Sequence, residues 1–108
     1  MILFPCPYLG KEVEFTDERV THVMARHPDL LPVHLNLVAE TLQDPDLVRV
    51  SARTVAAREF SRWYAELLNG EHVVVVVMTS KNERLRPSII TSYITRRLAK
   101  GNIEWSKN

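Results

Sequence analysis

Apolar residues recur at helical spacing in two stretches of the first half of the chain. The first stretch follows Thr16, whose side chain is well suited to cap a helix. We predict a helix from Asp17 to about His27, which ends there because Pro28 pushes the residue before it out of the α region. Its apolar stripe consists of Val20, Val23 and Met24.

The second stretch predicts a helix from about Pro32 to Gln43. Proline fits the first turn of a helix, where no backbone donor is needed. The apolar positions are Leu35, Val38, Ala39 and Leu42, a spacing that indicates packing against a large surface.

The rest of the pattern predicts strands. Five consecutive valines are β-branched and leave no polar face, so residues 73–78 are expected to form a central strand covered on both sides. Residues 12–15 alternate polar and apolar, which predicts a short edge strand. Further strands are predicted at residues 47–50, 88–95 and, at an edge, 103–105.

Three segments are predicted to lack strands. Residues 1–11 contain Pro5, Pro7 and Gly10 and predict an irregular N-terminal arm. Residues 81–87 predict a polar turn. Residues 96–101 predict one basic helical turn, closed by Gly101.

Residues 54–68 fit two structures. Ala56, Phe60, Trp63 and Leu67 have helical spacing, whereas Arg58, Phe60, Arg62 and Tyr64 would share one face of a strand. Asn69-Gly70 directly precedes the valine strand and favours a hairpin over a helix cap.

Together these elements predict an α+β fold. Two N-terminal helices would pack on one face of a mainly antiparallel sheet of four to five strands. A chain of 108 residues is expected to form a single domain, residues 1–108.

Composition narrows the range of functions. The lone cysteine, Cys6, excludes an internal disulfide and a multi-cysteine metal site. No signal peptide or membrane span is predicted, so we expect a cytoplasmic protein without membrane contact. Residues 1–52 hold four Lys/Arg and eight Asp/Glu, giving −4, whereas residues 53–108 hold ten and five, giving +5. A basic second half can attract phosphates, although a solvated mixed surface explains it as well.

The first predicted helix carries candidate chemistry at its end. Histidine titrates near neutral pH without help. His22 and Arg26 are four residues apart and share a face, and His27 lies at the C-terminal end. His22 and His27 do not share a face and are a poor ligand pair, so we predict no metal. Either histidine can also be a core-border residue or a helix cap.

The strand at 88–95 alternates in a way that suggests a second part of a site. Ile90, Ser92 and Ile94 are expected to face the helices, which turns Thr91, Tyr93 and Thr95 toward the open side. If residues 56–66 form a strand, Arg58, Arg62 and Tyr64 would lie beside them, with Trp63 on the opposite, packed face. Arginines and aromatic rings together can hold a polyanion with unstacked bases. An ordinary exposed strand face has the same composition.

These motifs occur in an order that resembles a known group. The order is Val13 to Arg19, His22, Arg26-His27-Pro28, Glu40 to Asp46, the valine strand and Ile90-Thr91-Ser92-Tyr93. It resembles small bacterial proteins of the BECR type, which include barnase, EndoU, the tRNase colicins, RelE and phage-associated relatives. The resemblance spans roughly residues 8–105.

The resemblance implies that the open face of the sheet cleaves RNA without a metal or other cofactor. A helical histidine would act as general acid or base, a basic strand residue would hold the phosphate, and a strand Thr or Tyr would orient it. The matching catalytic positions are His22, His27, Arg58, Arg62, Thr91 and Tyr93. Substrate contacts would come from Arg26, Tyr64, Thr95, Arg96 and Arg97.

Two hypotheses follow. The first is a toxin-like or phage-derived endoribonuclease that forms 2′,3′-cyclic phosphate ends. The second is a non-catalytic RNA- or protein-binding module on the same scaffold. The partners implied are RNA (tRNA or mRNA), a protein inhibitor, and a second copy of the chain paired through an edge strand. A histidine within about one water of Thr91, Tyr93 or an arginine in a concave pocket would favour the enzyme.

Overall fold

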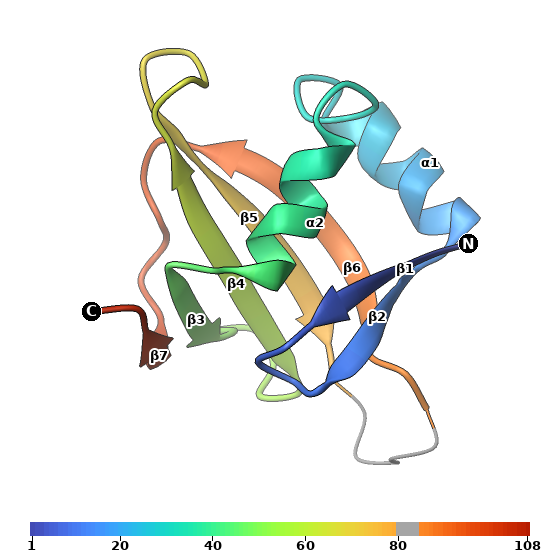
Figure 1. Ribbon diagram of the computed structural model, residues 1–108, viewed down its shortest axis with the longest axis vertical. Coiled ribbons are helices and arrows are strands. Elements are labelled where there is room, and N and C mark those ends of the chain that lie inside the picture. The colour runs from blue at the N-terminus through green and yellow to red at the C-terminus, as the bar shows by residue number, and fades with distance from the viewer. Residues whose placement is uncertain (80–84) are drawn as a thin grey trace.

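The computed structural model describes residues 1–79 and 85–108 and has an α+β fold, as predicted. The predicted polar turn at 81–87 falls largely outside the described residues. The helices are α1 (Asp17–Arg26) and α2 (Leu35–Gln43). The strands are β1 (Ile2–Cys6), β2 (Lys11–Phe15), β3 (Leu47–Val50), β4 (Ala57–Tyr64), β5 (Glu71–Met78), β6 (Ser88–Thr95) and β7 (Asn102–Ser106) (Figure 1).

These strands form one mixed sheet in the order β1-β2-β6-β5-β4-β3-β7. The predicted antiparallel sheet of four to five strands was therefore wrong. All pairs are antiparallel except β2 with β6, which meet in parallel at Glu14 and Ser88. The valine strand β5 is central, as predicted, and β7 forms one edge, also as predicted.

The extra strand comes from the N-terminal segment. We predicted an irregular arm at 1–11, but Ile2–Cys6 forms β1 and pairs with β2 along its whole length. Pro5 is tolerated because β1 is the outermost strand, where a missing backbone donor costs little. The strand predicted at 12–15 is consequently not at the edge.

Both helices form close to their predicted positions. The Thr16 Oγ1 accepts a hydrogen bond from the Arg19 backbone N–H (3.3 Å), and the His27 N–H closes α1 on the Val23 carbonyl (2.7 Å). The start of α2 lies at Leu35 rather than near Pro32, because residues 28–34 form turns.

Residues 54–68 resolve to the hairpin alternative. β4 pairs with β5 from Ala57–Met78 to Tyr64–Glu71, and residues 65–70 connect them. Asn69 (φ 74°) and Gly70 (φ 104°) supply the positive backbone angles that reverse the chain. Phe60 and Tyr64 face the helices, whereas Trp63 is 46% exposed on the other side, so its predicted packed orientation was wrong.

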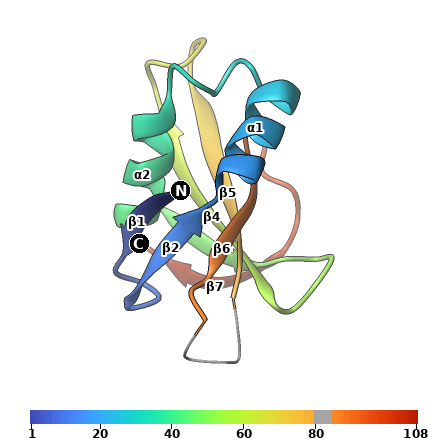
Figure 2. The same ribbon diagram turned by 90° about the vertical axis from the view of Figure 1, so that its right-hand side faces the viewer.

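The core lies between the helices and one face of the sheet. α2 packs across β4 and β5, and α1 lies beside β6 (Figures 1 and 2). The core includes Phe15, Val23, Leu30, Val38, Leu42, Phe60, Val73, Val75 and Val77. No described helix covers the opposite face, which we call the open face. None of the helices in the described part of the chain is long and apolar enough to span a membrane.

A crossover segment, residues 96–101, joins β6 to β7 on the far edge of the sheet. The basic helical turn predicted there was wrong, since these residues are bends and irregular backbone. Gly101 packs against the Val50 carbonyl oxygen and the Arg49 side chain, with an added Cβ 3.5 and 3.9 Å from them. The crossover segment therefore lies against the open face at its β3 end.

A bulge in β6 changes which residues reach the open face. Val76 pairs with Thr91 but Val77 pairs with Ile89, so Ile90 is the extra residue. Ile89 is buried in the core and Ile94 packs against it, whereas Ile90 does not join the core. Our prediction was right for Ile94 and for the pairing of β5 with β6, and wrong for Ile90.

Candidate functional site

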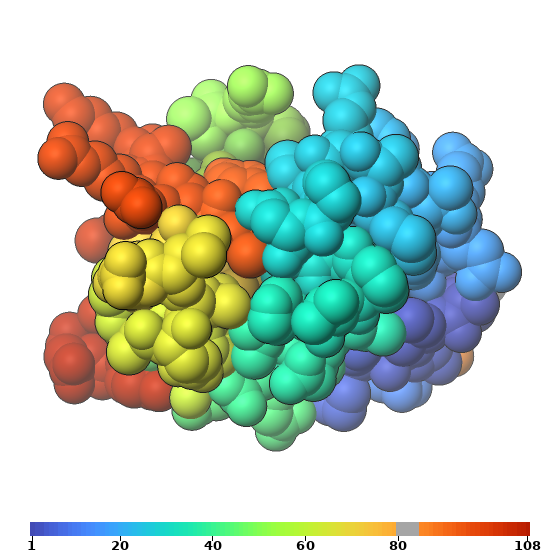
Figure 3. All heavy atoms as spheres, turned by 90° about the horizontal axis from the view of Figure 1, so that it is seen from above, coloured from blue at the N-terminus to red at the C-terminus, as the bar shows by residue number. Residues whose placement is uncertain are grey.

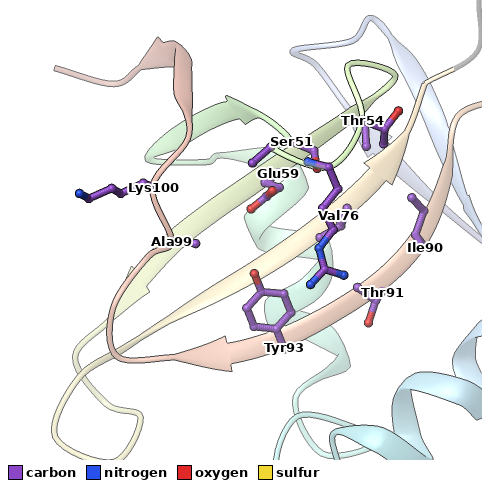
Figure 4. A pocket seen from close by; sticks show the side chains of 12 residues that line it. Ser51, Thr54, Glu59, Val76, Ile90, Thr91, Tyr93, Ala99 and Lys100 are labelled. Carbon is purple, nitrogen blue, oxygen red and sulfur yellow. The ribbon is translucent and has the colours of Figure 1, made fainter.

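The open face holds a pocket of about 400 Å³ beside the bulge. Its lining comes from four places: residues 51–54 after β3, β4 and β5 at the floor, β6 on one side, and the crossover segment on the other (Figure 4). Thr91 and Tyr93 contribute the β6 side. The predicted hydroxyl-bearing face of this strand therefore borders a concave surface.

The pocket is apolar at its floor and basic at its rim. Ala57, Val76 and Ile90 supply aliphatic surface. Arg53, which is exposed, brings a positive charge to the rim, whereas the Lys100 side chain points away from the pocket (Figure 4). Such a combination suits a ligand with a flat apolar part and an anionic part.

An ion pair fixes one wall of the pocket. Arg49 is 3% exposed, and its guanidinium lies 3.2 Å from the Glu59 carboxylate. The same guanidinium donates to the carbonyl oxygen of Ala99 in the crossover segment. Because both Glu59 and Ala99 line the pocket, this buried arginine holds its floor and its wall in one arrangement.

Tyr93 points across the pocket, with its hydroxyl end directed toward the side where Glu59 and Ala99 lie (Figure 4). Burial raises the pKa of the Tyr93 phenol, and the Glu59 charge raises it further, against the opposing effect of Arg49 and Arg53. The phenol is therefore neutral at physiological pH and can donate a hydrogen bond to a bound oxyanion.

His27 approaches Tyr93 from α1. The ring centroids are 5.9 Å apart and the planes are inclined by 38°. Beyond Ser88, β6 has no paired strand on the α1 side, so the helix end can reach that edge. Figure 3 shows the end of β6, in orange, next to the cyan turn that follows α1. The His27 ring therefore lies beside the Tyr93 ring at this edge of the sheet, although His27 itself does not line the pocket.

The other candidates on α1 are not brought to the pocket. His22 and Arg26 are both exposed on the helix. Among the described residues, neither contributes to the pocket lining. Of these three α1 residues, only His27 approaches a residue of the pocket lining, Tyr93.

The arginine face predicted on β4 lies on the wrong side of the sheet. Arg62 makes ion pairs with Glu40 of α2 (3.4 Å) and with Asp44 (2.6 Å). Tyr64 is buried beneath α2, and Arg58 pairs with Glu104 of β7 (3.0 Å). The prediction that Arg58, Arg62 and Tyr64 flank Thr91 and Tyr93 was wrong, because these residues alternate in phase with buried Phe60.

The end of β6 lies near the pocket without lining it. The Thr95 hydroxyl donates to the Arg97 carbonyl (2.8 Å), which fixes the turn into the crossover segment. Arg96 is 76% exposed and lies 3.6 Å from Glu71, and Arg97 is exposed. Both arginines are available to distant parts of a polyanionic ligand.

Sequence reasoning missed three charged residues of the pocket lining, Arg53, Glu59 and Lys100, and the buried Arg49 that holds Glu59. The excess of positive charge after residue 52 was the only signal for Arg53 and Lys100. Arg49 lies between two valines in a short strand, which predicts a residue on an exposed face but does not predict a pocket.

No protein-family model matches the chain, and neither a curated protein nor a solved structure matches it. The resemblance to BECR-type proteins consequently stays a prediction. Within the described residues, no three His, Cys, Asp or Glu side chains gather as a metal-binding group.

Proposed function

We propose that this protein is a metal-independent endoribonuclease whose site is the open-face pocket. The observation that carries the proposal is the approach of His27 to Tyr93, 5.9 Å between ring centroids, beside a pocket with an arginine at its rim. Cleavage of RNA by its own 2′-hydroxyl requires a proton acceptor, a neutral hydroxyl donor and a cation.

The roles follow from the chemistry of each group. His27 takes the proton from the ribose 2′-hydroxyl, whose oxygen then attacks the adjacent phosphorus. The bond to the 5′-oxygen breaks, leaving a 2′,3′-cyclic phosphate, and the leaving oxygen takes up a proton from solvent water. Tyr93 and Thr91 donate hydrogen bonds to the phosphoryl oxygens, and Arg53 offsets the charge that develops on them. Each proton transfer contributes a rate factor of roughly 10² to 10⁴.

The site residues of this proposal differ from those predicted from sequence. Arg53 takes the phosphate-holding role that was assigned to Arg58 or Arg62, because those two are engaged on the helix-covered side. His22 has no assigned role. RNA is the partner, and we place the reaction in the cytoplasm on the sequence argument alone.

Incubation of the protein with total RNA or tRNA in excess EDTA tests the proposal. We expect discrete fragments that are absent when His27 is replaced by alanine. Binding of RNA without any cleavage would replace this proposal by the binding-module alternative. Cleavage that EDTA abolishes would contradict the assigned chemistry.

A further inference from the structure

The pocket contains one acidic group in an otherwise basic setting, and this group has no role in the proposed cleavage. Glu59 lies on β4, paired with Val76 on β5, which in turn pairs with Thr91. Its side chain is 16% exposed and lines the pocket. The ion pair with Arg49 engages Oε1, and Oε2, which accepts no hydrogen bond from a described residue, can accept one from a ligand.

The shape and polarity of the pocket indicate which part of a nucleotide enters it. The floor is aliphatic, from Val76, Ala57 and Ile90, and suits the faces of a planar ring. Arg53 stands at the rim, where a phosphate stays hydrated on one side. A nucleotide would therefore enter base first, with its phosphate at Arg53.

Glu59 is held in a fixed orientation in the pocket. Its Oε1 accepts from the Arg49 guanidinium at 3.2 Å, and that guanidinium is also tied to the Ala99 carbonyl. Figure 4 shows the carboxylate between Ala99 and Val76, on the side of the pocket that the Tyr93 hydroxyl faces. A carboxylate can only accept hydrogen bonds, so it selects a base edge that donates.

We infer that the pocket binds a single unstacked nucleobase and that Glu59 selects bases with an exocyclic amino group. Adenine, guanine and cytosine carry such a group, and an acidic side chain can accept a hydrogen bond from the cytosine amino group. Uracil presents a carbonyl oxygen at the same position, and a fixed carboxylate opposite it leaves two acceptors facing each other. This inference rests on the proposed function for its choice of RNA as the ligand.

Nucleoside 3′-monophosphates test the inference without any cleavage. Isothermal titration calorimetry with cytidine and uridine 3′-monophosphate compares two probes that differ at the amino group. We expect wild-type protein to bind the cytidine form about tenfold more tightly, the lower range for one discriminating base contact. Adenosine and inosine 3′-monophosphate form a second matched pair with the same expected direction.

Two variants separate base selection from phosphate attraction. Glu59→Gln can present an amide donor or acceptor, so the preference for cytidine should fall to within about twofold. Arg53→Ala should weaken both nucleotides equally and leave the ratio unchanged, as expected for a phosphate contact. Thermal unfolding of Glu59→Gln checks that Arg49 tolerates the loss of its partner. If that variant does not fold, the affinity ratios of the wild-type protein for cytidine over uridine and for adenosine over inosine 3′-monophosphate still decide the inference.

The outcomes distinguish the two proposals. Equal affinity for both members of each pair, or no binding of any of the four nucleotides, overturns the inference even if the protein cleaves RNA. A clear preference for amino-bearing bases without RNA cleavage supports the inference and overturns the proposed enzyme.

Discussion

Replacing Tyr93 by phenylalanine separates catalysis from stability. The structure shows no hydrogen bond to the Tyr93 hydroxyl from any residue in 1–79 or 85–108, and the side chain is only partly buried. The ring and its contact with His27 remain in the variant. We expect the free energy of unfolding to change by less than about 1 kcal/mol, as for substitutions that leave no buried partner unsatisfied.

The expected effect on cleavage is much larger. If the neutral phenol donates to the phosphoryl group in the transition state, its loss should reduce kcat/KM by roughly 10²- to 10³-fold, or about 3–4 kcal/mol. His27→Ala should reduce it by about 10²- to 10⁴-fold, because it removes the proposed base. A large fall in kcat/KM with little change in the free energy of unfolding would show that the residue has a chemical role.

The assay is the initial rate of cleavage of a labelled RNA in EDTA, with thermal unfolding measured on the same samples. His34→Ala is the matched control. His34 precedes α2 and makes no capping hydrogen bond through its side chain, so the variant should change neither quantity. Wild-type rates in both Tyr93→Phe and His27→Ala, with wild-type protein active, would refute the site. A loss of activity that tracks a loss of folded protein would refute the chemical role.

Two further predictions concern the scaffold. Gly70→Ala should lower the free energy of unfolding by about 1–3 kcal/mol in urea titration, because φ is +104° and an added Cβ would lie 2.3 Å from the Trp63 ring; unchanged stability would contradict the turn geometry. Stability should also fall as pH rises from about 10 to about 12, since burial raises the pKa of both Tyr8 and Tyr64 to about 12, and the unfolded chain then ionises before the folded one. Tyr64→Phe should reduce this pH dependence, and an identical pH profile in that variant would contradict the assignment.

The sequence predicted the elements better than their arrangement. The helix capped by Thr16, the central valine strand and the final edge strand are local patterns, and all three formed. β1 was missed because Pro5, Pro7 and Gly10 predict an irregular segment, but Pro7 and Gly10 lie in the turn after β1, and Pro5 is acceptable within it because β1 is at the sheet edge. The position of β1 at the sheet edge depends on pairing between distant segments, and hydrophobic periodicity does not predict such pairing.

The site shows the same limit. Thr91 and Tyr93 were correctly placed on the open face because they alternate with Ser92 and Ile94, beyond the bulge. The side of the sheet on which Arg58 and Arg62 lie was predicted wrongly, because an alternating pattern does not show which of its two faces the helices cover. Phe60 and Tyr64 share their face and are buried, which places that face under the helices. The bulge at Ile90 also cannot be read from alternation, since it shifts the phase by one residue.

The central claim is that the 2′-hydroxyl of RNA attacks its own phosphodiester at the open-face pocket. The most direct measurement is mass spectrometry of fragment ends after incubation of a short RNA in EDTA, beside the same RNA with 2′-deoxynucleotides at the cleaved positions. We predict 2′,3′-cyclic phosphate and 5′-hydroxyl ends from the RNA and no cleavage at the substituted positions. Fragments with 5′-phosphate ends, or unchanged cleavage of the deoxy-substituted strand, would contradict the account.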